Sequence, residues 1–195
     1  MSALPSGSPE NQPPDSNENK SAGTTSKWAP VEPVPSSEML LAAFAGLTPI
    51  TTTDILDPAG DLVVRRERYG LASEVLASGA VASERVQSVA TALVSAKGKL
   101  DLLVTIIGAA VGKRLQRRQD GARPARPAAE ARPVPVHTES IGEIAARVAA
   151  LWEVVSANAG DVGDLSEADR LMELCEGYDS LVAEIEAGRR LPPGL

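Results

Sequence analysis

The stretch "VQSVATALVSAKGKLDLLVTIIGAA", Val86 to Ala110, decides the fold, because its apolar residues recur with a regular helical spacing. Steps of three and four residues alternate along it, which gives a period of 3.5 residues. A seam of this period is typical of helices that supercoil around partners, so the stretch predicts an oligomerising coiled coil. The seam consists of Val86, Val89, Leu93, Ala96, Leu100, Leu103, Ile107 and Ala110.

Two other readings of the same stretch stay open. It also suits one helix of an ordinary bundle, since Gly98 and Gly108 lower the stability expected of a coiled coil. The uncharged run from Leu102 to Gly112 is too short to cross a bilayer, which needs about 20 residues. A helix lying in the membrane interface normally carries Lys and Arg on its polar face, and this run has neither. The membrane-surface helix is therefore the weaker of these two readings, and no membrane partner is expected.

Composition favours helices over a sheet. Only 3% of the 195 residues are aromatic, and the apolar fraction consists mainly of Ala, Val and Leu, so we predict an all-α protein. A net charge of −7 argues against nucleic acid as a direct partner for the whole surface. One Cys and one His exclude an intrachain disulfide and a zinc site of the usual ligand count. No catalytic or phosphate-binding motif is present, so neither an enzyme nor a cofactor is expected.

The N-terminal part divides into two segments. Residues 1–35 are rich in Pro, Ser, Asn and Gly, which predicts a disordered tail, and they lack the features of a secretory signal. Residues 36–56 should form a short helix and a linker, with Ser36 as the N-cap. An apolar side of this helix predicts a segment that orders on a partner, although it can also fold back on the chain's own helices. That side consists of Met39, Leu40, Phe44 and Leu47.

Residues 57–119 should form a helix followed by the coiled-coil oligomerisation region. Asp57 and Pro58 have the residue types of an N-cap and a first helical position, and Gly79 separates this helix from the coil. A Pro, Ala and Arg-rich linker over 120–138 follows. The mixed residues of the seam do not select an oligomer number.

A basic cluster ends the coil: Lys113, Arg114, Arg117 and Arg118. Its simplest role is a favourable interaction of cations with the C-terminal end of the helix dipole. The alternative is a nuclear-import signal or a contact for an acidic surface. We expect the four side chains to form one exposed cluster.

Residues 139–188 should form a helical hairpin, and a tail over 189–195 follows. Ser140 and Glu143 have the spacing of a capping box, and apolar residues continue at steps of three and four. From Glu139 to Glu186 there are twelve acidic residues against two arginines. This imbalance predicts that the hairpin docks a basic partner.

The order of tail, short helix, coil, linker and helical module is similar to that of polymerase cofactors of non-segmented negative-strand RNA viruses. Within that group, "YGLASEVLASGAVASERVQSVATALVSAKGKLDLLVTI", Tyr69 to Ile106, resembles the stretch of bornavirus phosphoproteins that leads into their oligomerising coil. The resemblance implies a tetrameric, non-enzymatic adaptor that joins nucleoprotein to the RNA polymerase. It also implies a location in the host nucleus and cytoplasm.

A second class of function fits the same residues. The Ala, Arg and Val-rich composition equally suits a bacterial or phage coiled-coil scaffolding or regulatory protein, which would be cytoplasmic. In both cases the first expected partner is a second copy of the chain. Which other protein binds it separates the two classes.

Overall fold

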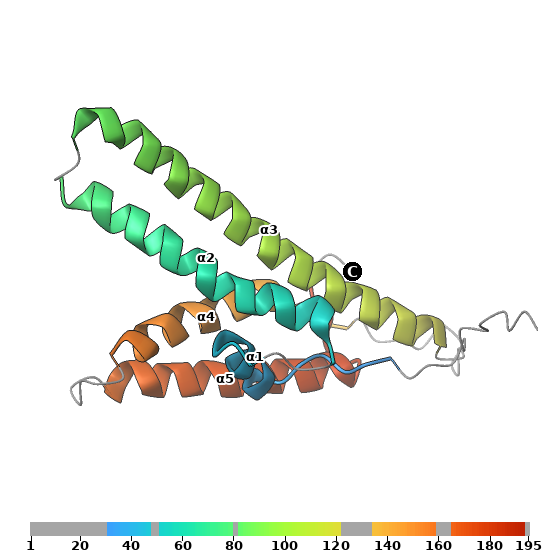
Figure 1. Cartoon of the computed structure of the whole chain (residues 1–195). Helices are drawn as coiled ribbons and strands as arrows, with labels where there is room; N and C mark the ends of the chain where they lie inside the picture. The colour runs from blue at the N-terminus through green and yellow to red at the C-terminus, as the bar shows by residue number, and fades with distance from the viewer. Residues whose placement is uncertain (1–30, 48–50, 80–81, 122–133, 159–164, 194–195) are drawn as a thin grey trace, which may run out of the picture. The chain divides into compact units, whose positions relative to one another are not determined.

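The computed structural model describes residues 31–47, 51–79, 82–121, 134–158 and 165–193. Every regular element within these ranges is an α-helix. They are α1 (Ser37–Phe44), α2 (Thr53–Ala77), α3 (Ser83–Gly121), α4 (Ile141–Ala157) and α5 (Leu165–Glu186), shown in Figure 1. A single isolated bridge between Val136 and Leu191 accompanies them. The prediction of an all-α protein is confirmed.

The two longest helices, α2 and α3, run side by side and share the most extensive helix contact of the described chain (Figure 1). Gly79 ends α2 with φ of +62°, a left-handed conformation that glycine adopts without steric cost. The end of this pair near Gly79 lies away from α4 and α5 in Figure 1. The chain therefore folds its predicted coil region against its own preceding helix.

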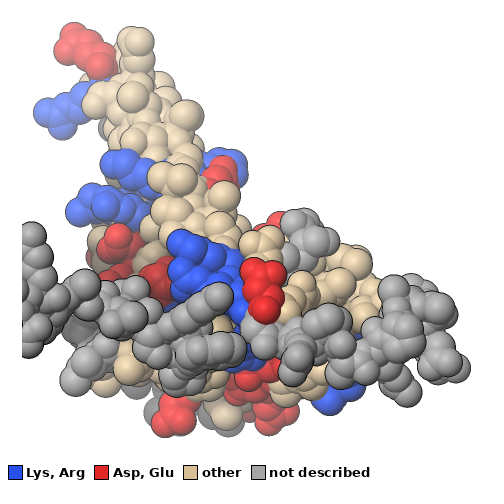
Figure 2. Space-filling view, turned by 90° about the vertical axis from the view of Figure 1, so that its right-hand side faces the viewer, with Lys and Arg blue, Asp and Glu red and all other residues tan. Residues whose placement is uncertain are grey.

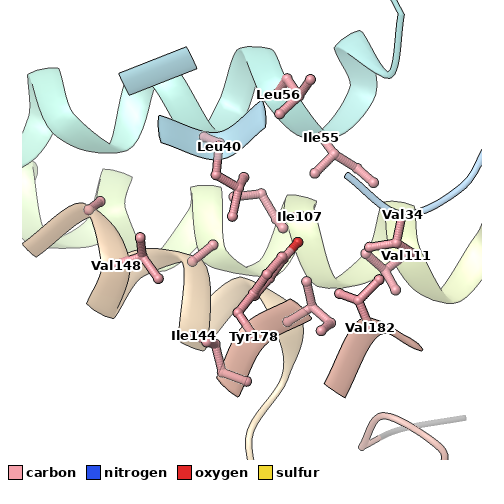
Figure 3. Close-up of a cluster of buried hydrophobic side chains, with 14 of the residues drawn as sticks. Val34, Leu40, Ile55, Leu56, Ile107, Val111, Ile144, Val148, Tyr178 and Val182 are labelled. Atoms are coloured by element: carbon pink, nitrogen blue, oxygen red, sulfur yellow. The ribbon is translucent and has the colours of Figure 1, made fainter. Parts of the chain in front are cut away.

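The core lies where α1, α4 and α5 meet the other end of this pair. Buried side chains from every helix converge there, among them Leu40, Ile55, Ile107, Val148 and Tyr178 (Figure 3). Their spacing explains the packing, because apolar residues at steps of three and four lie on one face of a helix. The apolar faces predicted for the C-terminal hairpin are confirmed as the faces that α4 and α5 bury.

Two glycines permit close helix crossings. A side chain at Gly142, at the start of α4, would overlap the carbonyl oxygen of Val104 on α3. A side chain at Gly60 on α2 would lie 3.2 Å from the carbonyl oxygen of Ala43 on α1. Only a residue without Cβ fits at the first crossing without moving backbone, so Gly142 fixes how closely α4 approaches α3.

A short extended segment before α1, residues 31–36, is hydrogen-bonded to α5. The Val34 N–H donates to Glu186 at 2.7 Å, and the Tyr178 hydroxyl donates to the Pro35 carbonyl at 2.9 Å. Ser37 then donates from its N–H and its hydroxyl to Asp179, at 2.8 and 2.6 Å. We call residues 31–36 the N-terminal strap, because these bonds tie it to α5.

Several predicted boundaries need correction. The disordered tail predicted for 1–35 lies outside the described residues up to residue 30, but disorder is wrong for its last residues, since Val34 and Pro35 are buried. The helix predicted to begin at Pro58, with Asp57 as its N-cap, begins at Thr53 instead. The Thr52 carbonyl accepts the N–H groups of Ile55 and Leu56, both at 3.0 Å, and Pro58 lies in the second turn.

The linker and the C-terminal tail also differ from expectation. Most of the linker predicted for 120–138 lies outside the described residues, whereas its last part pairs with the tail. The Leu191 N–H donates to the Pro135 carbonyl at 3.0 Å, and the His137 N–H donates to the Leu191 carbonyl at 2.8 Å. The tail predicted for 189–195 is therefore attached to the fold as far as Leu191.

Candidate interaction surfaces

Cys175 and His137, whose side chains are of the types that most often take part in catalysis, contact neighbouring residues of the fold. Cys175 is buried in the helical core, and burial raises the pKa of its thiol, which lowers its reactivity as a nucleophile. His137 accepts the Glu139 N–H at its Nδ1, at 3.1 Å. No group of His, Cys, Asp and Glu within the described ranges is arranged to hold a metal ion.

The predicted oligomerisation seam lies largely inside the fold. Ala96 and Ile107 are buried, Val89, Leu93, Leu100, Leu103 and Ala110 are half-buried, and Val86 is exposed. This pattern follows from the contact between α2 and α3 and, further along, from the core around α1 and α4. That this seam joins copies of the chain stays a prediction, and its residues would first have to leave these contacts.

A different face of α3 is apolar and exposed. Val94, Leu102 and Ile106 have exposed fractions of 72%, 58% and 39%, and Gly98 completes a row with steps of four residues. We call Val94, Gly98, Leu102 and Ile106 the outer stripe. The upper part of the molecule in Figure 2 has an uncharged column with charged residues of both signs at its edges.

Charged residues beside the outer stripe interact with each other. Lys97 and Asp101 form an ion pair at 3.2 Å across one helical turn. The stripe itself contains no charge, and Thr105 and Ala109 extend its uncharged surface toward the end of α3. Exposed rows of this kind on a charged protein mark surfaces that contact another molecule.

The predicted partner-binding helix is α1, which packs on the chain's own helices. Leu40 and Phe44 are buried in the shared core and Met39 is half-buried. Leu47, just after the helix, is 65% exposed. The structure thus shows the folded-back arrangement, and Leu47 is the one residue of this set that is exposed.

The basic cluster is divided by the fold. Lys113 and Arg117 are exposed, Arg118 forms an ion pair with Glu186 at 3.1 Å, and Arg114 is only 4% exposed. The expectation of one exposed cluster is therefore wrong for Arg114. Its guanidinium donates to the Pro33 carbonyl at 2.7 Å and pairs with Asp54 and Glu32.

These partners of Arg114 were not predicted from the sequence. Glu32 belongs to the N-terminal strap and Asp54 to the first turn of α2, which are 82 and 60 residues from Arg114 along the chain. No local pattern joins positions so far apart. The only available signal was an arginine within helical reach of the buried face of α3, next to Val111 and Leu115.

The acidic hairpin uses most of its described carboxylates within the fold. Glu143 accepts the Ser140 N–H at 2.6 Å, and this hydrogen bond holds the pKa of Glu143 below its usual range. Glu153 pairs with Arg66 of α2 at 3.2 Å, and Asp179 binds Ser37. The carboxylates that form no ion pair or hydrogen bond among the described residues are Asp169, Glu173 and Glu176 on α5.

Across the described ranges, no helix combines the length and the apolar character needed to cross a bilayer. Comparison of the chain with protein-family models, with curated proteins and with solved structures gave no match.

Proposed function

We propose that the chain is a non-enzymatic adaptor that associates with itself through the outer stripe of α3 and binds other proteins with its remaining surfaces. The observation that carries this proposal is the uncharged row of Val94, Gly98, Leu102 and Ile106, which stays exposed although the chain as a whole is acidic. A second copy is the partner that is always present, and two copies bring the same row to one interface.

The energetics favour a reversible complex. Full burial of a large aliphatic side chain contributes about 1.5 to 3 kcal/mol relative to full exposure. Val94, Leu102 and Ile106 still have part of this burial to gain. Association costs at least about 4 kcal/mol in lost translational and rotational freedom, so the gain from both copies leaves a modest surplus. A dimer that dissociates in the micromolar range is the expected outcome.

The sizes of the side chains favour an antiparallel arrangement. If two stripes pair about a two-fold axis near Leu102, Gly98 of one copy lies opposite Ile106 of the other, and Val94 lies opposite Ala110. Ile106 and Val94 then each meet a small residue, and Leu102 meets Leu102 of the other copy at the axis. A parallel pair would instead place Gly98 opposite Gly98 and leave a gap.

A finer proposal concerns the biological role. The resemblance of Tyr69–Ile106 to bornavirus phosphoproteins supports an adaptor that joins nucleoprotein to an RNA polymerase in the nucleus. The resemblance also implies a tetramer, which needs a second interface in addition to the paired outer stripes. The competing role is a bacterial or phage scaffolding protein with the same self-association. Co-purification of the tagged chain separates them, because only the first role recruits a nucleoprotein.

Cysteine cross-linking tests the pairing of the stripes. In a Cys175→Ala background, Gly98→Cys and Ile106→Cys chains are mixed and oxidised under mild conditions. We expect the mixed disulfide to form at least about tenfold faster than either symmetric one, because the two sites face each other. Faster symmetric disulfides would indicate a parallel pair, and equal slow rates for all three would contradict the outer-stripe interface.

A further inference from the structure

A second apolar surface lies between α1 and α2 and shares no residue with the outer stripe. It is a groove of about 340 Å³, lined mainly by apolar side chains, with Phe44 and Leu56 at its sides. Gly60 permits the close approach of the two helices, since a Cβ there would lie only 3.2 Å from the Ala43 carbonyl oxygen. The remaining apolar lining residues are Ala43, Leu47, Val63 and Val64.

Exposed apolar residues form both edges of the groove. Leu47 is 65% exposed on the α1 side and Val64 is 43% exposed on the α2 side. Leu71 and Val75 continue the apolar row of α2 beyond Val64 at helical spacing, and both are exposed. An occupant of the groove would therefore find further apolar contacts along α2.

Two carboxylates give the groove its charge. Asp57 and Asp61 line it, both are exposed, and neither forms an ion pair or hydrogen bond with any residue that the structure describes. They are one helical turn apart on α2, where like charges destabilise a helix by a few tenths of a kcal/mol. A cation placed between them would relieve this repulsion.

We propose that the groove binds a helical segment of a partner protein that carries large apolar side chains at steps of three and four, flanked by Lys or Arg. The volume is at the lower end of the range for ligand sites, which suits one or two inserted side chains. An apolar helix face lying in such a groove is a common mode of peptide recognition. The carboxylates select the basic flanks and speed the encounter.

The probe for this site is a synthetic peptide of about four helical turns, with a Leu stripe on one face and Lys beside it. Its binding to the intact chain is measured by fluorescence anisotropy at two salt concentrations. A peptide with Glu in place of each Lys, and a scrambled peptide without the stripe, are the reference probes. We expect the Leu and Lys peptide to bind at least about tenfold more tightly than either, with the difference from the Glu peptide shrinking at high salt.

Matched variants locate the binding. Leu47→Glu should lower the affinity for the peptide at least about tenfold. Asp57→Asn combined with Asp61→Asn should lower it about three- to tenfold, as expected for the loss of two exposed ion pairs. The controls change equally exposed residues elsewhere: Met172→Glu, and Asp169→Asn with Glu173→Asn, all on α5. If the groove variants and the controls lost equal affinity for the peptide, the peptide would bind only through the overall negative charge of the chain, and the proposal would be overturned.

Two further outcomes separate the groove from the outer stripe. Leu102→Asp should leave peptide binding unchanged, and loss of binding there would assign the peptide to the outer stripe instead. If Leu47→Glu lowers the molar mass of the chain in solution, a second copy occupies the groove and the partner proposed here is wrong. Peptide binding in the groove and self-association through α3 are thus tested separately.

Discussion

At the scale of single residues, Arg114 shows why a local pattern cannot give a side chain's role. The same sequence position fits a basic cluster at a helix end and a buried anchor for the N-terminal strap, and its helical spacing is compatible with both. The structure buries it against Asp54, Glu32 and the Pro33 carbonyl. Burial of an arginine is tolerated only when charged and polar partners surround it.

Gly142→Ala should destabilise the protein. The added Cβ would overlap the Val104 carbonyl oxygen and approach its carbonyl carbon to 3.0 Å, so α4 and α3 must move apart. We expect the free energy of unfolding to fall by at least about 2 kcal/mol, a typical cost of overpacking. Urea denaturation followed by circular dichroism measures it.

The matched control is Gly177→Ala in α5, where a Cβ would meet nothing within 4 Å. Helix propensity alone should then raise stability by about 0.5 to 1 kcal/mol. If both substitutions changed the free energy of unfolding in the same direction, the close crossing at Gly142 would not be present in solution.

Tyr178 should make stability fall in alkaline solution. Burial raises the pKa of its phenol, and the charges of Asp179 and Glu186 add to this shift. Because the pKa in the folded state lies above the unfolded value near 10, stability is unaffected at lower pH and falls once the unfolded chain loses the proton first. The expected slope is up to about 1.4 kcal/mol per pH unit above pH 10.

Denaturation midpoints from pH 8 to 11 measure this slope, and Tyr178→Phe provides the comparison. Phenylalanine keeps the packing but loses the hydrogen bond to the Pro35 carbonyl, so the variant should be about 1 kcal/mol less stable at neutral pH. It should also lose the part of the alkaline slope due to the phenol. An unchanged slope would mean that Tyr178 is not buried as described.

At the scale of helices, the sequence predicted what depends on neighbouring residues. The Ser36 cap, the capping box of Ser140 and Glu143 and the apolar faces of α4 and α5 all follow from spacings within one or two turns. The sequence did not predict the start of α2, because Thr52 adopts φ of +59°, a conformation that β-branched residues rarely adopt. The partner of the seam was not predictable either, since a period of 3.5 residues suits any neighbouring helix.

Leu100→Asp should therefore act mainly on folding rather than on assembly. Leu100 is half-buried against the core cluster, so a carboxylate there should lower the free energy of unfolding by about 2 to 4 kcal/mol. Met172→Asp, at a residue that is 57% exposed, should change it by less than about 0.5 kcal/mol. Thermal melts of both variants decide the point, and a fully stable Leu100→Asp chain would show that the seam is not packed inside the fold.

At the scale of the whole molecule, charge is distributed differently from the order along the chain. The acidic hairpin and the basic end of α3 meet through Arg118 and Glu186, and α4 meets α2 through Glu153 and Arg66. Ion pairs thus link the acidic hairpin to α2 and α3, and fewer charges are left for partners. Lys113 and Arg117 remain as the exposed part of the basic cluster.

If these two residues direct nuclear import, Lys113→Ala with Arg117→Ala should abolish nuclear accumulation of a fluorescent fusion in cells. Stability should change little, because both side chains are exposed. Lys97→Ala with Lys99→Ala is the control with the same loss of charge on the same helix. Nuclear accumulation that survives the first pair, or that is absent from the parent chain, would remove the import proposal and weaken the viral role.

Sedimentation equilibrium of the intact chain and of Leu102→Asp tests self-association through the outer stripe most directly. Leu102 is 58% exposed, so the substitution should leave folding intact while it buries a charge in the proposed interface. We expect the intact chain to show a concentration-dependent mass above that of the 20.2 kDa monomer. Leu102→Asp should be monomeric at the same concentrations, and Met172→Asp, at a residue of nearly equal exposure, should behave like the intact chain. A monomeric intact chain, or a Leu102→Asp variant that associates as strongly as Met172→Asp, would contradict it.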